Sequence, residues 1–292
     1  MGSARKLLIA AVAVAAAVLA PGSAAHAQAP RAGAPTPGEA AGSRLAIDLA
    51  TTGNLSRGLV YRDLITNRGV LQAWSGPWGI YLQPYWLYSR VGTAAGRVTA
   101  DNDIYVRLGM FRNLTRSVFV TAVNVYDHNL RRRVAHRDLF GAGAGANLVQ
   151  QKPVLIATSV AVLGEVTDFD GERLLIDGEP GPDTTATRKT ARWAVRLHGR
   201  YRLGGGRLSL VHDLIVMPSF RDPANDYRIN FSGTIDAPIA KGFAARVQAE
   251  GTREGVIVEG TTRDALVVTF GVSYRAEWQR TPPAPAPAPP AP

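Results

Sequence analysis

The side chains best suited to nucleophilic chemistry lie in the segment RLSLVHDLIVMP, which holds Ser209, His212 and Asp213. A serine hydrolase needs such side chains at one point in space. The segment alternates as a strand does, and neighbouring residues of a strand point to opposite faces. His212 and Asp213 are therefore not expected to share a site. The sequence also lacks H-E-x-x-H, G-x-S-x-G, Walker and EF-hand patterns, so we expect no enzymatic activity and no cofactor.

A second group of chemically capable residues is an acidic segment between Val166 and Thr190. Asp168, Asp170 and Glu172 are its weak candidates for a divalent-cation site, because carboxylate oxygens are the ligands that hard cations prefer. Gly171 comes too early in this segment for the glycine of an EF-hand loop. The main interpretation is a solvated acidic loop, and cation bridging to anionic lipid is the alternative.

Arginine is the third group, and its spacing is that of a strand. In the stretch TARWAVRLHGRYRL one parity is apolar and the other carries five basic side chains, which are Arg192, Arg196, His198, Arg200 and Arg202. Successive strand residues point to opposite faces, so one face here is apolar and the other is basic. A sandwich strand with a solvated face and a transmembrane barrel strand with a polar interior both fit this pattern.

The ends of the chain predict export. Arg5 and Lys6 precede an apolar run, and the small-residue motif AHA ends at Ala27, which predicts a cleavable signal peptide over residues 1–27. The run is shorter than the roughly 20 residues that a spanning helix needs. Residues 28–42 and 280–292 are rich in proline and alanine, so we expect flexible segments around a folded region of residues 43–279.

Composition excludes several classes of protein. The chain has 292 residues, a formal charge of +10, 46% hydrophobic residues and no cysteine. Without cysteine it has neither disulfides nor a thiolate metal site. Its basic residues are spread through alternating segments and form no nucleic-acid-binding motif, so we expect no nucleic-acid partner.

The folded region contains about twelve segments with strand-like alternation. They are residues 44–51, 58–74, 78–91, 103–111, 117–127, 139–148, 154–164, 190–203, 207–218, 227–238, 243–252 and 264–278. The register of 58–74 and of 117–127 is open. Short connections alternate with longer ones along the chain, which is typical of outer-membrane barrels with short periplasmic turns and longer external loops. We therefore predict an all-β fold, an antiparallel up-and-down transmembrane barrel of about twelve strands.

In such a barrel the basic face lines the lumen. Parity predicts that further charged residues face inward with the five above, namely Asp48, Arg228, Asp236, Arg246 and Glu250. Asp213 is another plausible acidic partner for the arginines. A barrel of this size, filled with such side chains, should pass little more than small ions, with a weak preference for anions. The alternatives are a lipid-modifying barrel enzyme and a soluble periplasmic β-sandwich that binds a ligand.

The last predicted strand carries a possible assembly signal. Gly271, Tyr274 and Trp278 follow a pattern similar to the terminal-strand signal read by the barrel assembly machinery. We therefore expect this machinery, outer-membrane lipid and lipopolysaccharide as partners of a monomeric barrel.

Four stretches together resemble a known family. They are GNLS after the first strand, HRDLFGAGAGANL, VMPSFRDPANDYRI and TRDALVVTFGVSYRAEW. They resemble the salt-induced outer membrane protein family, a domain family of unknown function, over nearly all of residues 43–278. The resemblance implies an outer-membrane barrel, and an expected role in envelope stability or stress response is taken from the family's label; the resemblance does not supply an activity. The acidic segment and the proline-rich tail depart from the family pattern.

Overall fold

The computed structural model describes residues 43–56, 61–93, 96–151, 153–183 and 187–280. The predicted signal peptide, the segment 28–42 and the tail beyond residue 280 lie outside the described residues. Within them, no helix is long and apolar enough to cross a membrane.

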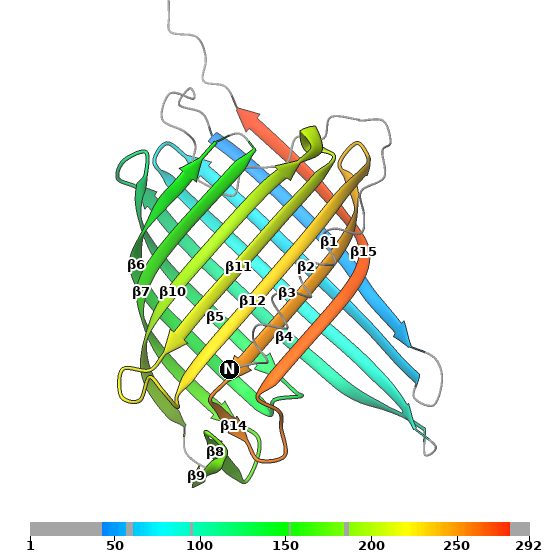
Figure 1. The fold of residues 1–292 in the computed structure, drawn as a ribbon, viewed down its shortest axis with the longest axis vertical. Coiled ribbons are helices and arrows are strands. Elements are labelled where there is room, and N and C mark those ends of the chain that lie inside the picture. Colours follow the sequence, from blue (N-terminus) through cyan, green and yellow to red (C-terminus); the bar gives the residue numbers. More distant parts are fainter. Residues whose placement is uncertain (1–42, 57–60, 94–95, 152, 184–186, 281–292) are drawn as a thin grey trace, which may run out of the picture.

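Twelve antiparallel strands form a closed barrel, in which β15 pairs with β1 (Figure 1). The barrel strands are β1 (Ser43–Ser56), β2 (Tyr61–Ser75), β3 (Trp78–Thr93), β4 (Gly96–Asn113), β5 (Val118–Asn129), β6 (Val134–Gln150), β7 (Val154–Phe169), β10 (Arg188–Leu203), β11 (Leu208–Pro218), β12 (Tyr227–Ala240), β13 (Phe243–Glu254) and β15 (Asp264–Arg280). Each strand pairs with the barrel strands that precede and follow it in the chain. This confirms the predicted up-and-down barrel and excludes the β-sandwich alternative.

The connections between barrel strands differ at the two ends of the barrel. At one end, which we call the turn end, they are tight: Gly76 and Pro77 join β2 to β3, and η1 (Gly204–Gly206) joins β10 to β11. At the other end, the loop end, residues 170–187 and 255–263 join β7 to β10 and β13 to β15. Several strands run further toward the loop end than the sequence predicts, and β6 begins at Val134 rather than Leu139. Both open registers are now defined, since β2 pairs with β1 and β5 with β6 along nearly their full lengths.

The acidic segment contains a hairpin that sequence reasoning missed. β8 (Arg173–Ile176) and β9 (Glu179–Asp183) pair with each other, and β8 also pairs with β14 (Val256–Val258). Asp177 and Gly178 between them both have positive φ, which suits the two-residue turn of a hairpin. Leu174, Val256 and Val258 form a small buried core under this sheet, which lies at the bottom of Figure 1. The predicted solvated loop is therefore largely an ordered three-stranded sheet.

The outer surface of the barrel is a band of exposed apolar side chains. On β15 the residues of one parity are exposed, and Phe270 is 60% exposed. The same holds on other strands for Leu49, Ile80, Leu108, Val162 and Trp193. Soluble monomers rarely expose a contiguous apolar area of this extent, whereas a lipid-facing barrel surface is apolar.

Candidate functional site: the barrel lumen

The lumen is lined by charged side chains from the opposite parity of the same strands. Arg192 is only 2% exposed, whereas its neighbour Trp193 is exposed on the outside. Arg200 and Arg246 are also buried. Because charges in a confined space need partners, the carboxylates that face the lumen decide how it is filled.

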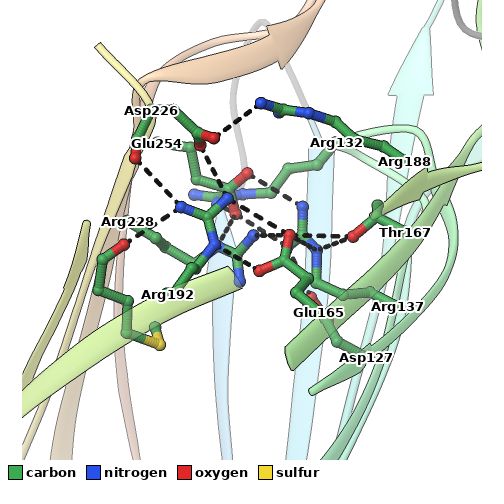
Figure 2. A network of polar contacts seen from close by, with 11 residues as sticks. Asp127, Arg132, Arg137, Glu165, Thr167, Arg188, Arg192, Asp226, Arg228 and Glu254 are labelled. Atoms are coloured by element: carbon green, nitrogen blue, oxygen red, sulfur yellow. Dashed lines mark hydrogen bonds and ion pairs between the residues drawn. The ribbon is translucent and has the colours of Figure 1, made fainter. Parts of the chain in front are cut away.

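The densest group of charges lies near the loop end, and Figure 2 shows it. We call it the arginine–glutamate cluster, and its members are Arg132, Arg137, Arg192, Arg228, Glu165 and Glu254. They come from β6, β7, β10, β12, β13 and the turn between β5 and β6. Six parts of the chain thus meet inside the barrel at one level.

Glu254 is one centre of the cluster. Arg132 Nη1 lies 2.7 Å from its Oε1, and Arg137 Nη1 and Arg228 Nε each lie 3.0 Å from the same atom. Arg137 is 1% exposed. β6 and β13 are separated by four strands on one side of the barrel and six on the other, so the Arg137–Glu254 pair bridges the lumen.

Glu165 is the other centre. Arg192 Nε donates to its Oε2 at 2.7 Å, and Arg228 Nη2 donates to its Oε1 at 3.2 Å. Arg192 also donates to Asp226 Oδ1 at 2.8 Å, and Arg188 holds the other oxygen of Asp226 at 2.7 Å. Asp127 accepts from Arg137 at 3.1 Å. Every guanidinium of the cluster is thus held by at least one carboxylate.

A second bridge crosses the lumen at mid-height. Arg196 donates to both oxygens of Asp213, at 2.6 and 2.8 Å. Arg107 Nη1, on β4, lies 3.6 Å from Asp213 Oδ2 on β11 and stacks over the ring of Tyr81. β4 and β11 are also four strands apart on one side and six on the other. His198, two residues from Arg196, has both ring nitrogens buried without a hydrogen-bond partner.

A third group of charges lies along the wall toward the turn end. Arg246 donates to Asp236 at 2.6 Å and lies 3.1 Å from Asp48, which also accepts from Arg275 at 2.5 Å. These residues come from adjacent or nearly adjacent strands, so their pairs follow the wall rather than cross it. Glu250 pairs with Arg68 at 3.6 Å. Arg202 is also on the inward parity of β10, at its turn end.

Between these groups the lumen contains a cavity of about 370 Å³. Part of its wall is apolar, and the buried cluster of Leu139, Leu163, Ala194 and Met217 lies on it. Val123, Val125, Ala161 and Ile215 extend this wall. The sequence did not predict an apolar section inside the barrel.

The other candidate chemistries do not assemble. His212 stacks on Tyr201 of the outward parity, whereas Asp213 points into the lumen, so a Ser–His–Asp site does not form from these residues. Within the described residues, no group of three or more His, Cys, Asp or Glu side chains is placed to hold a metal ion, and Asp168, Asp170 and Glu172 form no such group.

The residues of the predicted assembly signal lie on the closing strand of the barrel. Tyr274 and Trp278 are exposed on the outside of β15, and the centre of the Tyr274 ring lies 4.9 Å from the centre of the Phe243 ring. Gly271 faces inward against β1, where a Cβ would lie 2.1 Å from the Thr51 carbonyl oxygen. That glycine is therefore required by the close approach of the strands.

Sequence reasoning missed most of the arginine–glutamate cluster. The predicted strand segments leave Arg132 and Arg137 in the connection between residues 127 and 139. In the structure both pair instead with Glu254, because β6 begins five residues earlier than predicted and Arg137 faces inward. Glu165 and Glu254 also lie near the loop end, and their inward parity was the signal available in the sequence. Asp226 lies in the connection between β11 and β12, where no parity applies.

Solved structures with a similar fold are outer-membrane barrels. The NanC porin aligns with 10% identity and a TM-score of 0.45, over 78% of this chain and 98% of that chain. An outer membrane channel from Pseudomonas putida F1 aligns with 13% identity and a TM-score of 0.41, over 83% and 99%. The translocator domain of the autotransporter NalP from Neisseria meningitidis aligns with 10% identity and a TM-score of 0.40, over 82% and 90%. No protein-family profile and no curated protein sequence matches the chain. The resemblance to the salt-induced family therefore stays a prediction.

Proposed function

We propose that the protein is a non-enzymatic outer-membrane barrel whose lumen forms a narrow polar pore with a weak preference for anions. The observation that carries the proposal is the pair of ion-pair bridges across the lumen, Arg137 to Glu254 near the loop end and Arg107 to Asp213 at mid-height. They narrow the lumen, which keeps a partly open cavity of about 370 Å³. Side chains that cross a pore limit it to small solutes.

The apolar outer band supports placement in a membrane. Outward strand residues such as Val162 and Phe270 are exposed and apolar, while Glu165 and Thr269 on the inward parity of the same strands are polar and buried. This is the inside-out arrangement of a transmembrane barrel. With the signal peptide that the sequence predicts, the barrel would lie in the outer membrane, with the turn end toward the periplasm.

Heat-modifiability and conductance test the proposal. The full chain should migrate differently on a gel before and after boiling, as a folded barrel does, and should remain in carbonate-washed outer membranes. In planar bilayers it should give small single-channel currents with a reversal potential that favours chloride over potassium. Cation selectivity, or the absence of any current from a heat-modifiable barrel, would contradict the proposed pore.

Partners and the physiological role form a further part of the proposal. We propose contacts with lipopolysaccharide and recognition of Gly271, Tyr274 and Trp278 by the assembly machinery, since the aromatic side chains are exposed on the closing strand. Trp278→Ala should slow insertion in cells without destabilising the purified barrel. A role in envelope stability under salt stress rests on the family resemblance, and a deletion strain that grows normally at high salt would contradict it.

A further inference from the structure

The lumenal cavity combines an apolar wall with an excess of positive charge. Leu139, Leu163 and Met217 lie on the wall between the arginine–glutamate cluster and the mid-height bridge. These three side chains pack on one another and are at most 5% exposed, whereas Val123 and Val125 beside them are partly exposed to the cavity. Such an exposed apolar surface in a water-filled pore is unfavourable unless something apolar covers it. Hydrated inorganic ions make no favourable contact with such an apolar wall.

The charged groups beside this wall are incompletely paired. Arg107 and Arg196 share the single carboxylate of Asp213, so these three side chains carry a formal charge of +1. Arg107 Nε is buried without a hydrogen-bond partner, although its Nη1 lies near Asp213. A buried guanidinium donor left without an acceptor is costly, and a carboxylate is the acceptor that it pairs with best.

Two further unpartnered groups line the same cavity. His198 has two buried ring nitrogens without a hydrogen-bond partner, and Asn230 has a buried side-chain oxygen without one. Native proteins satisfy nearly all such atoms, so a polar guest in this cavity would supply the partners that Arg107, His198 and Asn230 need. The apolar wall indicates that the guest has an apolar part as well.

We propose that the lumen binds a small amphipathic monocarboxylate, with its carboxylate at Arg107 and its apolar body on the apolar wall at Val123 and Val125. The inference rests on the proposed pore and names the class of solute that it admits. The cavity of about 370 Å³ lies at the lower end of the volumes of small-molecule sites. A single aromatic ring or a short alkyl chain is therefore the largest body that we expect to fit.

Three probes separate the two parts of the site. 3-Phenylpropionate has both the carboxylate and the apolar body, 3-phenylpropan-1-ol has the body alone, and acetate has the carboxylate alone. In calorimetric titrations of the full-length barrel in a neutral detergent, 3-phenylpropionate should bind saturably, with one molecule per barrel. The alcohol and acetate should bind at least about tenfold more weakly, since each lacks one of the two interactions.

Two variants assign the binding to the named residues. Arg107→Gln should weaken 3-phenylpropionate binding about tenfold or more, and it leaves Asp213 paired with Arg196. Val123→Thr keeps the shape of the side chain but places a hydroxyl on the apolar wall, and should weaken binding about threefold. Arg253→Gln, on the exposed loop end of β13, is the matched control and should bind as the wild type does. Heat-modifiability verifies that each variant is folded.

The outcomes distinguish this inference from the proposed pore. The inference is wrong if 3-phenylpropionate gives no saturable binding, if the alcohol binds as tightly, or if Arg107→Gln binds as the wild type does. A barrel that conducts chloride without binding the acid would overturn the inference and keep the pore. A barrel that binds the acid saturably but passes no current would keep the site and overturn the pore.

Discussion

Replacing Glu254 by glutamine tests whether the arginine–glutamate cluster closes the loop end of the lumen. The substitution removes a charge and keeps the size of the side chain. Glu254 is only 5% exposed and is held by Arg132, Arg137 and Arg228 at 2.7 to 3.0 Å. Arg228 and Arg137 retain Glu165 and Asp127, whereas Arg132 loses the carboxylate that anchors it across the lumen.

Both stability and ion selectivity should change in Glu254→Gln. Removing one partner of a buried ion pair costs about 3 kcal/mol, and little solvent reaches these groups to screen the loss. The lumen also loses one negative charge. A unit charge acts on an ion about 5 Å away with about 0.8 kcal/mol in a water-like dielectric. Its loss favours chloride and disfavours potassium by that amount each, so the ratio of chloride to potassium permeability should rise roughly 15-fold. Arg132 then keeps only the Thr252 carbonyl oxygen, at 3.3 Å, as an acceptor on β13, so it is held more weakly and the conductance of the pore should rise.

Guanidinium unfolding followed by tryptophan fluorescence measures the first effect, and the reversal potential in a potassium chloride gradient measures the second. Asp264→Asn is the matched control, because Asp264 is 68% exposed on its side chain and pairs with Arg253 at 3.4 Å. Such a surface pair contributes about 0.5 kcal/mol or less. If Glu254→Gln behaves as Asp264→Asn does in both measurements, the cluster neither stabilises nor closes the lumen, and our interpretation of it is wrong.

Three other substitutions test the barrel wall. Val162→Arg, on the outer face, should destabilise the barrel in bilayers by about 2–4 kcal/mol, whereas Leu114→Arg, in a turn, should have little effect; equal stability in lipid would argue against a lipid-facing band. Gly143→Val should abolish the heat-modifiable form, because a Cβ there would lie 2.1 Å from the Val160 carbonyl oxygen, and a normally folded variant would show that β6 and β7 lie further apart. Asp48→Asn should cost only about 1 kcal/mol in guanidinium unfolding, since Arg246 retains Asp236 and Arg275, which loses its carboxylate, is partly exposed to solvent. A loss as large as that of Glu254→Gln would contradict the pairing described for the turn end.

The alternation of apolar and polar residues predicted the barrel strands, because the direction of each side chain in a strand depends only on local backbone geometry. A strand points successive side chains to opposite faces, so β10 and β15 could be assigned their two faces from parity. The loop-end extensions of the strands were not predicted. There the alternation of apolar residues ends in the sequence, although the strands continue to pair by backbone hydrogen bonds. β6 is an example, since its first residues before Leu139 include Arg137 and Asp138 and resemble a polar loop.

The ion-pair partners could not be predicted in the same way. Parity places Arg137 and Glu254 inside the barrel, but their contact depends on the number of strands and on the stagger between them. These two residues are 117 positions apart in the chain and come from nearly opposite walls. Partners on adjacent strands, such as Arg246 and Asp236, are the ones that sequence reasoning could reach.

The register that the sequence left open carries functional information of its own. Residues 117–127 are apolar on both parities, and the structure explains why: β5 presents Val118 and Val120 outward and Val123 and Val125 to the cavity. A strand between lipid and an aqueous pore should alternate, so loss of alternation marks a place where the lumen wall is apolar. In this barrel that place lies beside Arg107 and Asp213, at the mid-height bridge. An apolar wall next to an incompletely paired arginine suits an amphipathic anion better than a hydrated inorganic ion.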